Sequence, residues 1–359
     1  MAVSVMLKPA SSLCNLKCKY CFYSSLALDR QEYSKGFMTA ETAQNVIKSA
    51  FLLAKGTPVV FVFQGGEPSL RGLDFYKDFV QICQKENSQN SSVSFCFQSN
   101  GTLLDDDWCA FFKKNNFLVG ISLDGNEIQN QYRVYPDGKE SFSDVMNAVS
   151  LLKKHNVRFN ILSVVTKNLA RSGREHFRFM KQNDIFDFQY INCLKPLDKQ
   201  ADGDLYMNED DYAEFLEKTF RLYYNSNMRG SKTSVRSFDN YLMLLSGGNA
   251  EQCSMNGFCS PQFVVEGDGT VYPCDFFCTD EFELGNINDK SFLEMSRGEA
   301  FKKFLKSGTA VDECCKQCTY FVLCRGGGCK RQKLDGDFCR VYKKFFSSSI
   351  DMMKNMIGR

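Results

Sequence analysis

Hydrophobic residues in the first half of the chain follow two alternating patterns. Short runs rich in apolar and β-branched residues predict strands at 3–8, 58–64, 92–98, 117–123, 157–165 and 186–192. Longer stretches with helical spacing separate them, at 39–54, 73–86, 105–115, 142–155 and 172–182. Thr39 and Asp105 are the expected N-caps of their helices. The strands are apolar on both faces, as in a buried parallel sheet, so the repeated strand–helix order predicts an α/β fold.

Six strand–helix units are fewer than the eight of a complete barrel. We therefore predict a partial (β/α)6 TIM barrel, with an open doubly wound sheet as the alternative. Residues 195–250 are expected to be a connector with two helices, and 263–273 to form a hairpin. From residue 251, cysteines, glycines and turns replace the periodic pattern. We expect one domain at 1–230 and a small cysteine-rich domain at 231–359 that needs metal to fold.

Polar segments follow each predicted strand. They are a cysteine loop at 14–21, Gln64-Gly65-Gly66-Glu67-Pro68, Gln98-Ser99-Asn100-Gly101, Ser122-Leu123-Asp124-Gly125, Thr166-Lys167-Asn168 and Asn192-Cys193. Active sites of barrels built from strand–helix units lie at the carboxyl ends of the strands. Six separate segments therefore indicate one functional face.

Composition narrows the function classes. The chain has 359 residues and a net charge of +2, without a strongly basic stretch, so no nucleic-acid partner is predicted. The N-terminal residues lack the pattern of a signal peptide and no apolar run is long enough to span a bilayer, so we expect a cytoplasmic protein without a membrane partner. Seventeen cysteines in such a chain indicate metal or redox chemistry rather than disulfides. The two histidines, His155 and His176, are expected at the solvated surface of helices, which makes histidine-based catalysis an improbable function.

The cysteine loop has the spacing Cys14-x3-Cys18-x2-Cys21. Three thiolates can ligate three irons of a four-iron cluster, which leaves the fourth iron open for a substrate. A zinc ion would normally need a fourth ligand, and none is present nearby in the sequence.

With its flanking aromatic residues, this motif resembles that of the radical S-adenosylmethionine (SAM) superfamily. The resemblance implies that the cluster binds SAM. It also assigns SAM contacts to Gly65, Gly66 and Glu67 after the second strand, and to Ser122 and Asp124 after the fourth.

Eight cysteines in the C-terminal third resemble the SPASM domain, which binds two auxiliary four-iron clusters. The resemblance implies one cluster on Cys253, Cys259, Cys274 and Cys329, and another on Cys315, Cys318, Cys324 and Cys339. Four residues rather than the usual three separate Cys324 from Cys329. Zinc sites with four thiolates each are the alternative.

Six cysteines lie outside these sets. Cys83, Cys96, Cys109 and Cys193 are expected to be buried free thiols, whereas Cys278 and Cys314 lie next to expected ligands. Cys315 is preferred over Cys314 because it keeps the two-residue spacing to Cys318.

The resemblance extends over nearly the whole chain to the anaerobic sulfatase-maturating enzymes, through segments 7–12, 21–23, 63–68, 160–162, 191–194 and 259–276. Those enzymes convert a cysteine or serine of a nascent sulfatase into formylglycine without oxygen. The resemblance implies Asp275 as general base, and Tyr23 and Gln64 as residues that line the peptide site. It also implies SAM and three [4Fe–4S] clusters as cofactors, and a sulfatase polypeptide as a partner. A low-potential electron donor such as flavodoxin or ferredoxin is the other expected partner.

Two other functions are compatible with part of the pattern. A SPASM enzyme that forms thioether or carbon–carbon crosslinks in a ribosomal peptide often has an N-terminal recognition domain, which does not fit before Cys14. An iron–sulfur electron carrier or a zinc-binding interaction module would need neither the Gly-Gly-Glu-Pro segment nor the polar strand ends.

Overall fold

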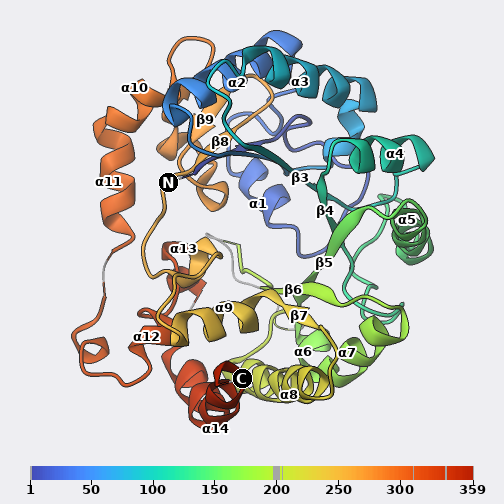
Figure 1. The fold of residues 1–359 in the computed structure, drawn as a ribbon, viewed down its shortest axis with the longest axis vertical. Coiled ribbons are helices and arrows are strands. Elements are labelled where there is room, and N and C mark those ends of the chain that lie inside the picture. Colours follow the sequence, from blue (N-terminus) through green and yellow to red (C-terminus); the bar gives the residue numbers. More distant parts are fainter. Residues whose placement is uncertain (1, 197–202, 204, 310, 336–337, 359) are drawn as a thin grey trace. The chain divides into compact units, whose positions relative to one another are not determined.

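The computed structural model describes residues 2–196, 203, 205–309, 311–335 and 338–358 (Figure 1). The chain forms two compact units that do not follow chain order. Unit 1 comprises Met1–Ser122, Tyr132–Phe159 and Pro261–Phe304, and unit 2 comprises Leu123–Gln131, Asn160–Ser260 and Leu305–Arg359. In the described part of the chain, every helix is too short or too polar to cross a lipid bilayer.

The sheet of unit 1 has a parallel centre. Strands β1 (Val3–Leu7), β2 (Val59–Phe63), β3 (Val93–Ser99) and β4 (Leu118–Ser122) lie side by side in chain order. Val5 pairs with Phe61, which pairs with Phe95, so their side chains lie at the same level of the sheet. The connecting helices are α2 (Ala40–Ala54), α3 (Leu73–Glu86), α4 (Asp106–Lys114) and α5 (Phe142–Lys154).

A hairpin from the C-terminal third extends this sheet on the other side of β1. Strand β8 (Phe263–Val265) pairs in parallel with β1, β9 (Thr270–Tyr272) pairs antiparallel with β8, and β10 (Gly285–Asn286) continues the sheet. The helix α10 (Phe292–Arg297) follows, and its Phe292 backbone N–H donates to Ser49 Oγ of α2. The predicted hairpin is therefore confirmed, and its place beside β1 brings residues 266–278 next to the N-terminal cysteine loop.

Unit 2 has three parallel strands and a helical layer. The strands are β5 (Arg158–Val165), β6 (Asp187–Asn192) and β7 (Ser234–Val235). The helices are α6 (Lys167–Arg171), α7 (Gly173–Gln182), α8 (Glu209–Met228), α9 (Arg236–Leu245) and α14 (Cys339–Ile357), and α14 packs against both α8 and α9 (Figure 1). Between these helices, Phe345 of α14 contacts the rings of Phe220 and Phe238. The short helices α12 (Phe321–Cys324) and α13 (Lys330–Asp335) carry cysteines or lie next to them, and the remaining helices are α1 (Phe22–Leu28) in unit 1 and α11 (Glu299–Ser307).

The predicted elements of the first half are confirmed to within one or two residues at each end. Thr39 caps α2 by accepting from the N–H of Thr42, and Asp105 caps α4 by accepting from the N–H of Trp108. The expected division at residue 230 stays a prediction.

The prediction for His176 is wrong. Its side chain is fully buried, and its ring nitrogens contact Ser163 Oγ at 2.9 Å and the hydroxyl of Tyr190 at 3.3 Å. Burial lowers the pKa of His176 to about 3, so the imidazole is neutral at physiological pH.

Candidate active site

The cysteine loop lies between β1 and α1 in unit 1 and is held by backbone hydrogen bonds. The N–H groups of Lys17 and Lys19 donate to the carbonyls of Val134 and Tyr132 at 2.7 and 3.0 Å, as in a short pair of strands. The N–H of Cys21 donates to the carbonyl of Cys18. The loop therefore has a defined shape, imposed by a segment more than one hundred residues away in the sequence.

The three thiols of the loop lie close enough to influence one another. Although Cys14 is exposed, desolvation by the surrounding protein raises the pKa of its thiol, and the neighbouring Glu67, Cys18 and Cys21 add to this effect. Asn100, which follows β3, places its side-chain nitrogen 3.8 Å from Cys14 Sγ and donates to Asn15 at 2.8 Å. A positively charged iron–sulfur core would relieve the thiols by holding them as thiolates. That these three cysteines ligate one cluster stays a prediction.

The Gly-Gly-Glu-Pro segment packs directly against the start of the cysteine loop. A side chain on Gly66 would place its Cβ only 2.3 Å from the carbonyl oxygen of Leu13 and 2.7 Å from that of Ser11. The backbone N–H of Glu67 donates to the carbonyl of Leu13 at 2.8 Å. Gly66 is therefore required for close backbone approach to the loop, a role in addition to the SAM contact expected from the sequence.

Glu67 is buried and its carboxylate is held by donors of the chain itself. It accepts from the backbone and hydroxyl of Ser69, from the hydroxyl of Ser99 and from the backbone N–H of Asn100, at 2.6–3.0 Å. Burial raises the pKa of Glu67, and these hydrogen bonds partly oppose the rise. The carboxylate thus joins the second and third strand ends, and its contact with SAM stays a prediction.

Ser122 is the last residue of β4 and Asp124 lies two residues further on, and the two residues belong to different units. Ser122 Oγ accepts from the side chain of Gln98 at 3.1 Å. Asp124 is buried, and its Oδ1 accepts from the backbone N–H of Val164 at 2.8 Å, which fixes it to β5. Their expected contacts with SAM also stay predictions.

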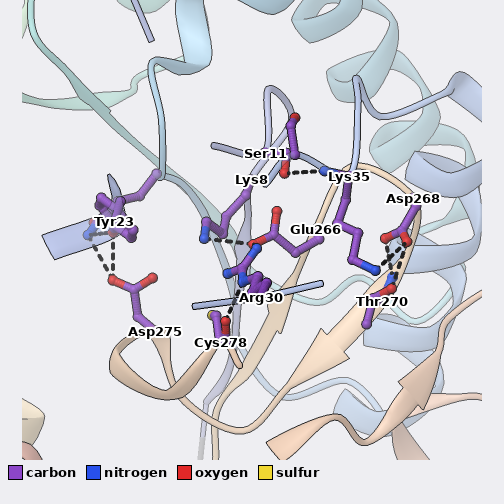
Figure 2. Close-up of polar contacts among 12 residues, drawn as sticks. Lys8, Ser11, Tyr23, Arg30, Lys35, Glu266, Asp268, Thr270, Asp275 and Cys278 are labelled. Carbon is purple, nitrogen blue, oxygen red and sulfur yellow. Dashed lines mark hydrogen bonds and ion pairs between the residues drawn. The ribbon is translucent and has the colours of Figure 1, made fainter. Parts of the chain in front are cut away.

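Tyr23, Gln64 and Asp275 come together in unit 1, and Figure 2 shows Tyr23 beside Asp275. The hydroxyl of Tyr23 donates to Asp275 Oδ2 at 2.6 Å, and Gln64 donates to the Tyr23 oxygen at 2.7 Å. Gln64 also lies 3.4 Å from Asp275 Oδ2. Three residues that are far apart in the sequence therefore form one hydrogen-bonded group next to the cysteine loop.

Asp275 has one carboxylate oxygen in use and one without a partner. Its side chain is buried, and Oδ1 has no hydrogen-bond partner among the described residues. Burial raises the pKa of Asp275, and the positive charge of Lys8 and the hydrogen bond from Tyr23 partly oppose the rise. A buried carboxylate oxygen without a partner is costly, so it indicates a position at which a polar group of a ligand binds.

A buried group of charged side chains lies near Asp275. It was not predicted from the sequence. Glu266 Oε1 accepts from Lys8 Nζ at 2.7 Å and lies 2.9 Å from Arg30 Nη1, with these side chains almost fully excluded from solvent (Figure 2). Burial alone would raise the pKa of Glu266, but Lys8 and Arg30 outweigh it and lower the pKa. Arg30 Nε also donates to the carbonyl of Cys278 at 2.5 Å. This Lys8–Glu266–Arg30 triad connects β1, the segment after α1 and the hairpin.

In unit 2, four of the expected auxiliary ligands line one cavity. Cys315, Cys318, Cys324 and Cys339 face it together with Tyr320, Phe321 and Tyr342. Cys314 lines the same cavity, and it contributes to raising the pKa of Cys315 to about 11, after burial as the largest cause. The site thus offers five thiols where a cluster needs four.

The other expected cluster has three of its ligands in unit 2. Burial raises the pKa of Cys259, and the neighbouring Cys253 and Cys329 add to the rise, so these thiols lie close together. Two glycines of this region are closely packed. An added Cβ on Gly308 would lie 2.3 Å from Cys259 Sγ, and an added Cβ on Gly328 would lie 2.1 Å from Gln332 Oε1. Cys274, the fourth expected ligand, belongs to unit 1.

Among the described residues, no three side chains of His, Cys, Asp or Glu converge tightly enough to hold a single metal ion. Thiolates ligate both iron–sulfur clusters and zinc, so the chemistry of the thiol-lined cavity suits either group. Of the remaining cysteines, Cys83, Cys109, Cys193 and Cys278 are buried, and Cys96 is half-buried rather than buried as expected.

Comparisons with known proteins identify the family of the chain. The radical SAM superfamily model matches residues 9–180, and an iron–sulfur cluster-binding domain model matches residues 257–319. The chain is 41% identical to the cysteine-type anaerobic sulfatase-maturating enzyme of Clostridium novyi, with 98% of this chain and 96% of the relative covered. It is 31% identical to the serine-type enzyme of Bacteroides thetaiotaomicron, covering 98% and 91%.

A solved structure described as native anSMEcpe with bound AdoMet and Cp18Cys peptide matches with a TM-score of 0.94 and 38% identity, over 100% of this chain and 99% of that one. This likeness confirms the predicted α/β fold, with a partial (β/α)6 barrel and a C-terminal SPASM domain. The chain therefore belongs to the anaerobic sulfatase-maturating enzymes of the radical SAM superfamily.

Proposed function

We propose that this enzyme oxidises a cysteine or serine side chain of a sulfatase polypeptide to formylglycine without oxygen. The observation that carries the proposal is the Oδ1 atom of Asp275, which is buried, has no partner among the described residues, and lies on a carboxylate held by Tyr23 and Gln64. The identity to sulfatase-maturating relatives over the whole chain supports it.

The cofactors are SAM and [4Fe–4S] clusters, one at Cys14, Cys18 and Cys21 and two in the SPASM domain. SAM bound at the reduced cluster would supply the chemistry that abstracts a hydrogen atom from the target Cβ. Gly65, Gly66, Glu67, Ser122 and Asp124 are the residues that we expect to hold SAM.

Asp275 would complete the oxidation by accepting the proton of the target thiol or hydroxyl at Oδ1. The target has then lost one hydrogen atom, one proton and one further electron. An auxiliary cluster would accept this electron. A cysteine becomes a thioaldehyde, and water replaces its sulfur to give the aldehyde. Tyr23 and Gln64 keep Oδ2 occupied, so that Oδ1 remains the oxygen available to the substrate.

We further propose that cysteine is an accepted target, because identity to the cysteine-type relatives is 41% against 31% for a serine-type relative. The electron donor would be a low-potential protein such as a flavodoxin or ferredoxin. Cysteines that form no disulfide, together with oxygen-sensitive clusters, suit the reducing cytoplasm, where we place the enzyme.

The proposal is tested by Asp275→Asn, which keeps the shape of the side chain and removes the base. Reconstituted wild type and variant are incubated anaerobically with SAM, a reductant and a peptide containing C-x-P-x-R. We expect the variant to keep cleaving SAM while aldehyde formation falls by about 10²–10⁴-fold, the usual contribution of a positioned base. Equal aldehyde formation by both proteins would remove Asp275 from the mechanism.

A further inference from the structure

The Lys8 ammonium group lies next to the hydrogen-bonded group formed by Tyr23, Gln64 and Asp275, over the face of the Tyr23 ring. Lys8 follows β1, and its side chain is 1% exposed. Its Nζ donates to Glu266 at 2.7 Å and lies 4.8 Å from the centre of the Tyr23 ring (Figure 2). A cation over an aromatic face is attracted to it, and more strongly where water is excluded.

The path of the Lys8 side chain depends on a glycine of the Gly-Gly-Glu-Pro segment. A Cβ on Gly65 would lie 2.4 Å from Lys8 Cε and 2.7 Å from Lys8 Cγ. Gly65 also has a φ of +107°, which strongly favours glycine. Because Gly65 has no side chain, it leaves room for the aliphatic part of the Lys8 side chain, which extends to Tyr23.

Glu266 fixes the other side of the ammonium group. Because Arg30 contacts the same Oε1 atom at 2.9 Å, Glu266 cannot easily turn away from Lys8. Arg30 is in turn held by the carbonyl of Cys278. The charge above the Tyr23 ring is therefore anchored by two elements of unit 1, the hairpin and the segment after α1.

We propose that Lys8 is a positioning residue for the oxidation step, which fixes the Tyr23 ring and thereby holds the Tyr23 hydroxyl on Asp275. This inference rests on the proposed function. The hydroxyl of Tyr23 reaches Asp275 Oδ2 at 2.6 Å, so the direction of its ring, set by two side-chain torsions, determines whether this hydrogen bond forms. A ring without the cation behind it can tilt, and Asp275 can then turn Oδ1 away from the substrate.

The alternative is that the triad serves only to stabilise the fold. Lys35 offers a matched control, because it also joins the N-terminal segment to the hairpin without touching Tyr23. Its Nζ lies 3.8 Å from Asp268 Oδ2, and its backbone N–H donates to Ser11 Oγ at 2.9 Å (Figure 2).

The first experiment compares Lys8→Met and Lys35→Met as reconstituted enzymes with matched iron content. We expect kcat for aldehyde formation by Lys8→Met to fall by about 10–100-fold, since a misplacement of about 1 Å can cost about 10²-fold. KM should change less than threefold, and 5′-deoxyadenosine should continue to form, so that more SAM is consumed per aldehyde. Lys35→Met should stay within about twofold of wild type.

The second experiment is a double-mutant cycle with Tyr23→Phe. If Lys8 acts through the Tyr23 hydroxyl, Lys8→Met should have little further effect in the Tyr23→Phe background. Additive losses, or equal behaviour of Lys8→Met and Lys35→Met, would overturn the inference. If Lys8→Met does not fold, Lys8→Gln keeps a donor for Glu266 and should give the same result. Failure of the wild type to form aldehyde would instead refute the proposed function.

Discussion

Gly66→Ala should displace the start of the cysteine loop from its position against the segment that follows β2. The new Cβ would lie 2.3 Å from the carbonyl oxygen of Leu13, whereas real Cβ contacts essentially never fall below 3.0 Å, so this carbonyl must retreat by about 0.7 Å. Leu13 precedes Cys14 directly, and metal–ligand distances tolerate only about 0.2 Å. The displacement therefore exceeds what a cluster ligand can absorb.

The cost in stability follows from the same contacts. At a φ of +56°, alanine pays about 1–2 kcal/mol of backbone strain. Moving the Leu13 carbonyl also weakens its 2.8 Å hydrogen bond from the Glu67 N–H, which costs about 1–3 kcal/mol when both groups are buried. We expect a total loss of about 2–5 kcal/mol, concentrated at the loop.

The assay is iron and sulfide content after anaerobic reconstitution, together with SAM cleavage. Gly66→Ala should lose about four irons per chain and cleave no SAM, while the other clusters remain. Gly72→Ala is the control, because Gly72 has a φ of +83° but nothing within 4 Å of its added Cβ. If Gly66→Ala retained its full iron content, or if both variants lost iron equally, the close backbone approach would not be the reason that glycine is required at position 66.

Two further predictions concern unit 2. Because the pKa of His176 falls from an ordinary 6.5 to about 3 on folding, the unfolded chain binds a proton more readily below pH 6.5, and stability is lost as pH falls. Between pH 7.5 and 5.5 the free energy of unfolding of wild type should drop by about 1.4 kcal/mol more than that of His176→Gln, measured by denaturant titration; equal slopes would contradict a buried neutral imidazole. Since Cys314 lines the same cavity as Cys315, Cys315→Ala should retain more iron than Cys318→Ala, and equal loss of about four irons would show that Cys314 cannot replace its neighbour.

Local patterns made most of the first half predictable. The strands and helices carry their own periodicity, and the caps of α2 and α4 are single residues whose effect is local. The burial of His176 could also have been predicted, because it shares one helical face with Gly173, Phe177 and Met180. Polarity alone predicts exposure for a histidine, whereas its place in the helical pattern predicts burial.

The tertiary contacts of the site residues could not be predicted from the sequence. Nothing local indicates that β8 pairs with β1, or that Lys8 meets Glu266, which lies 258 residues further along the chain. Such contacts are fixed by tertiary packing and leave no periodic signal. The family resemblance identified Tyr23, Gln64 and Asp275 as candidates, while their hydrogen bonds emerge only from the folded chain.

The most direct test of the account follows a hydrogen atom. A C-x-P-x-R peptide with deuterium on the cysteine Cβ is incubated anaerobically with the reconstituted enzyme, SAM and a reductant. We predict one deuterium in each 5′-deoxyadenosine, and one aldehyde for each of these molecules. Aldehyde without deuterium transfer, a crosslinked peptide, or SAM cleavage that leaves the peptide unchanged would contradict it.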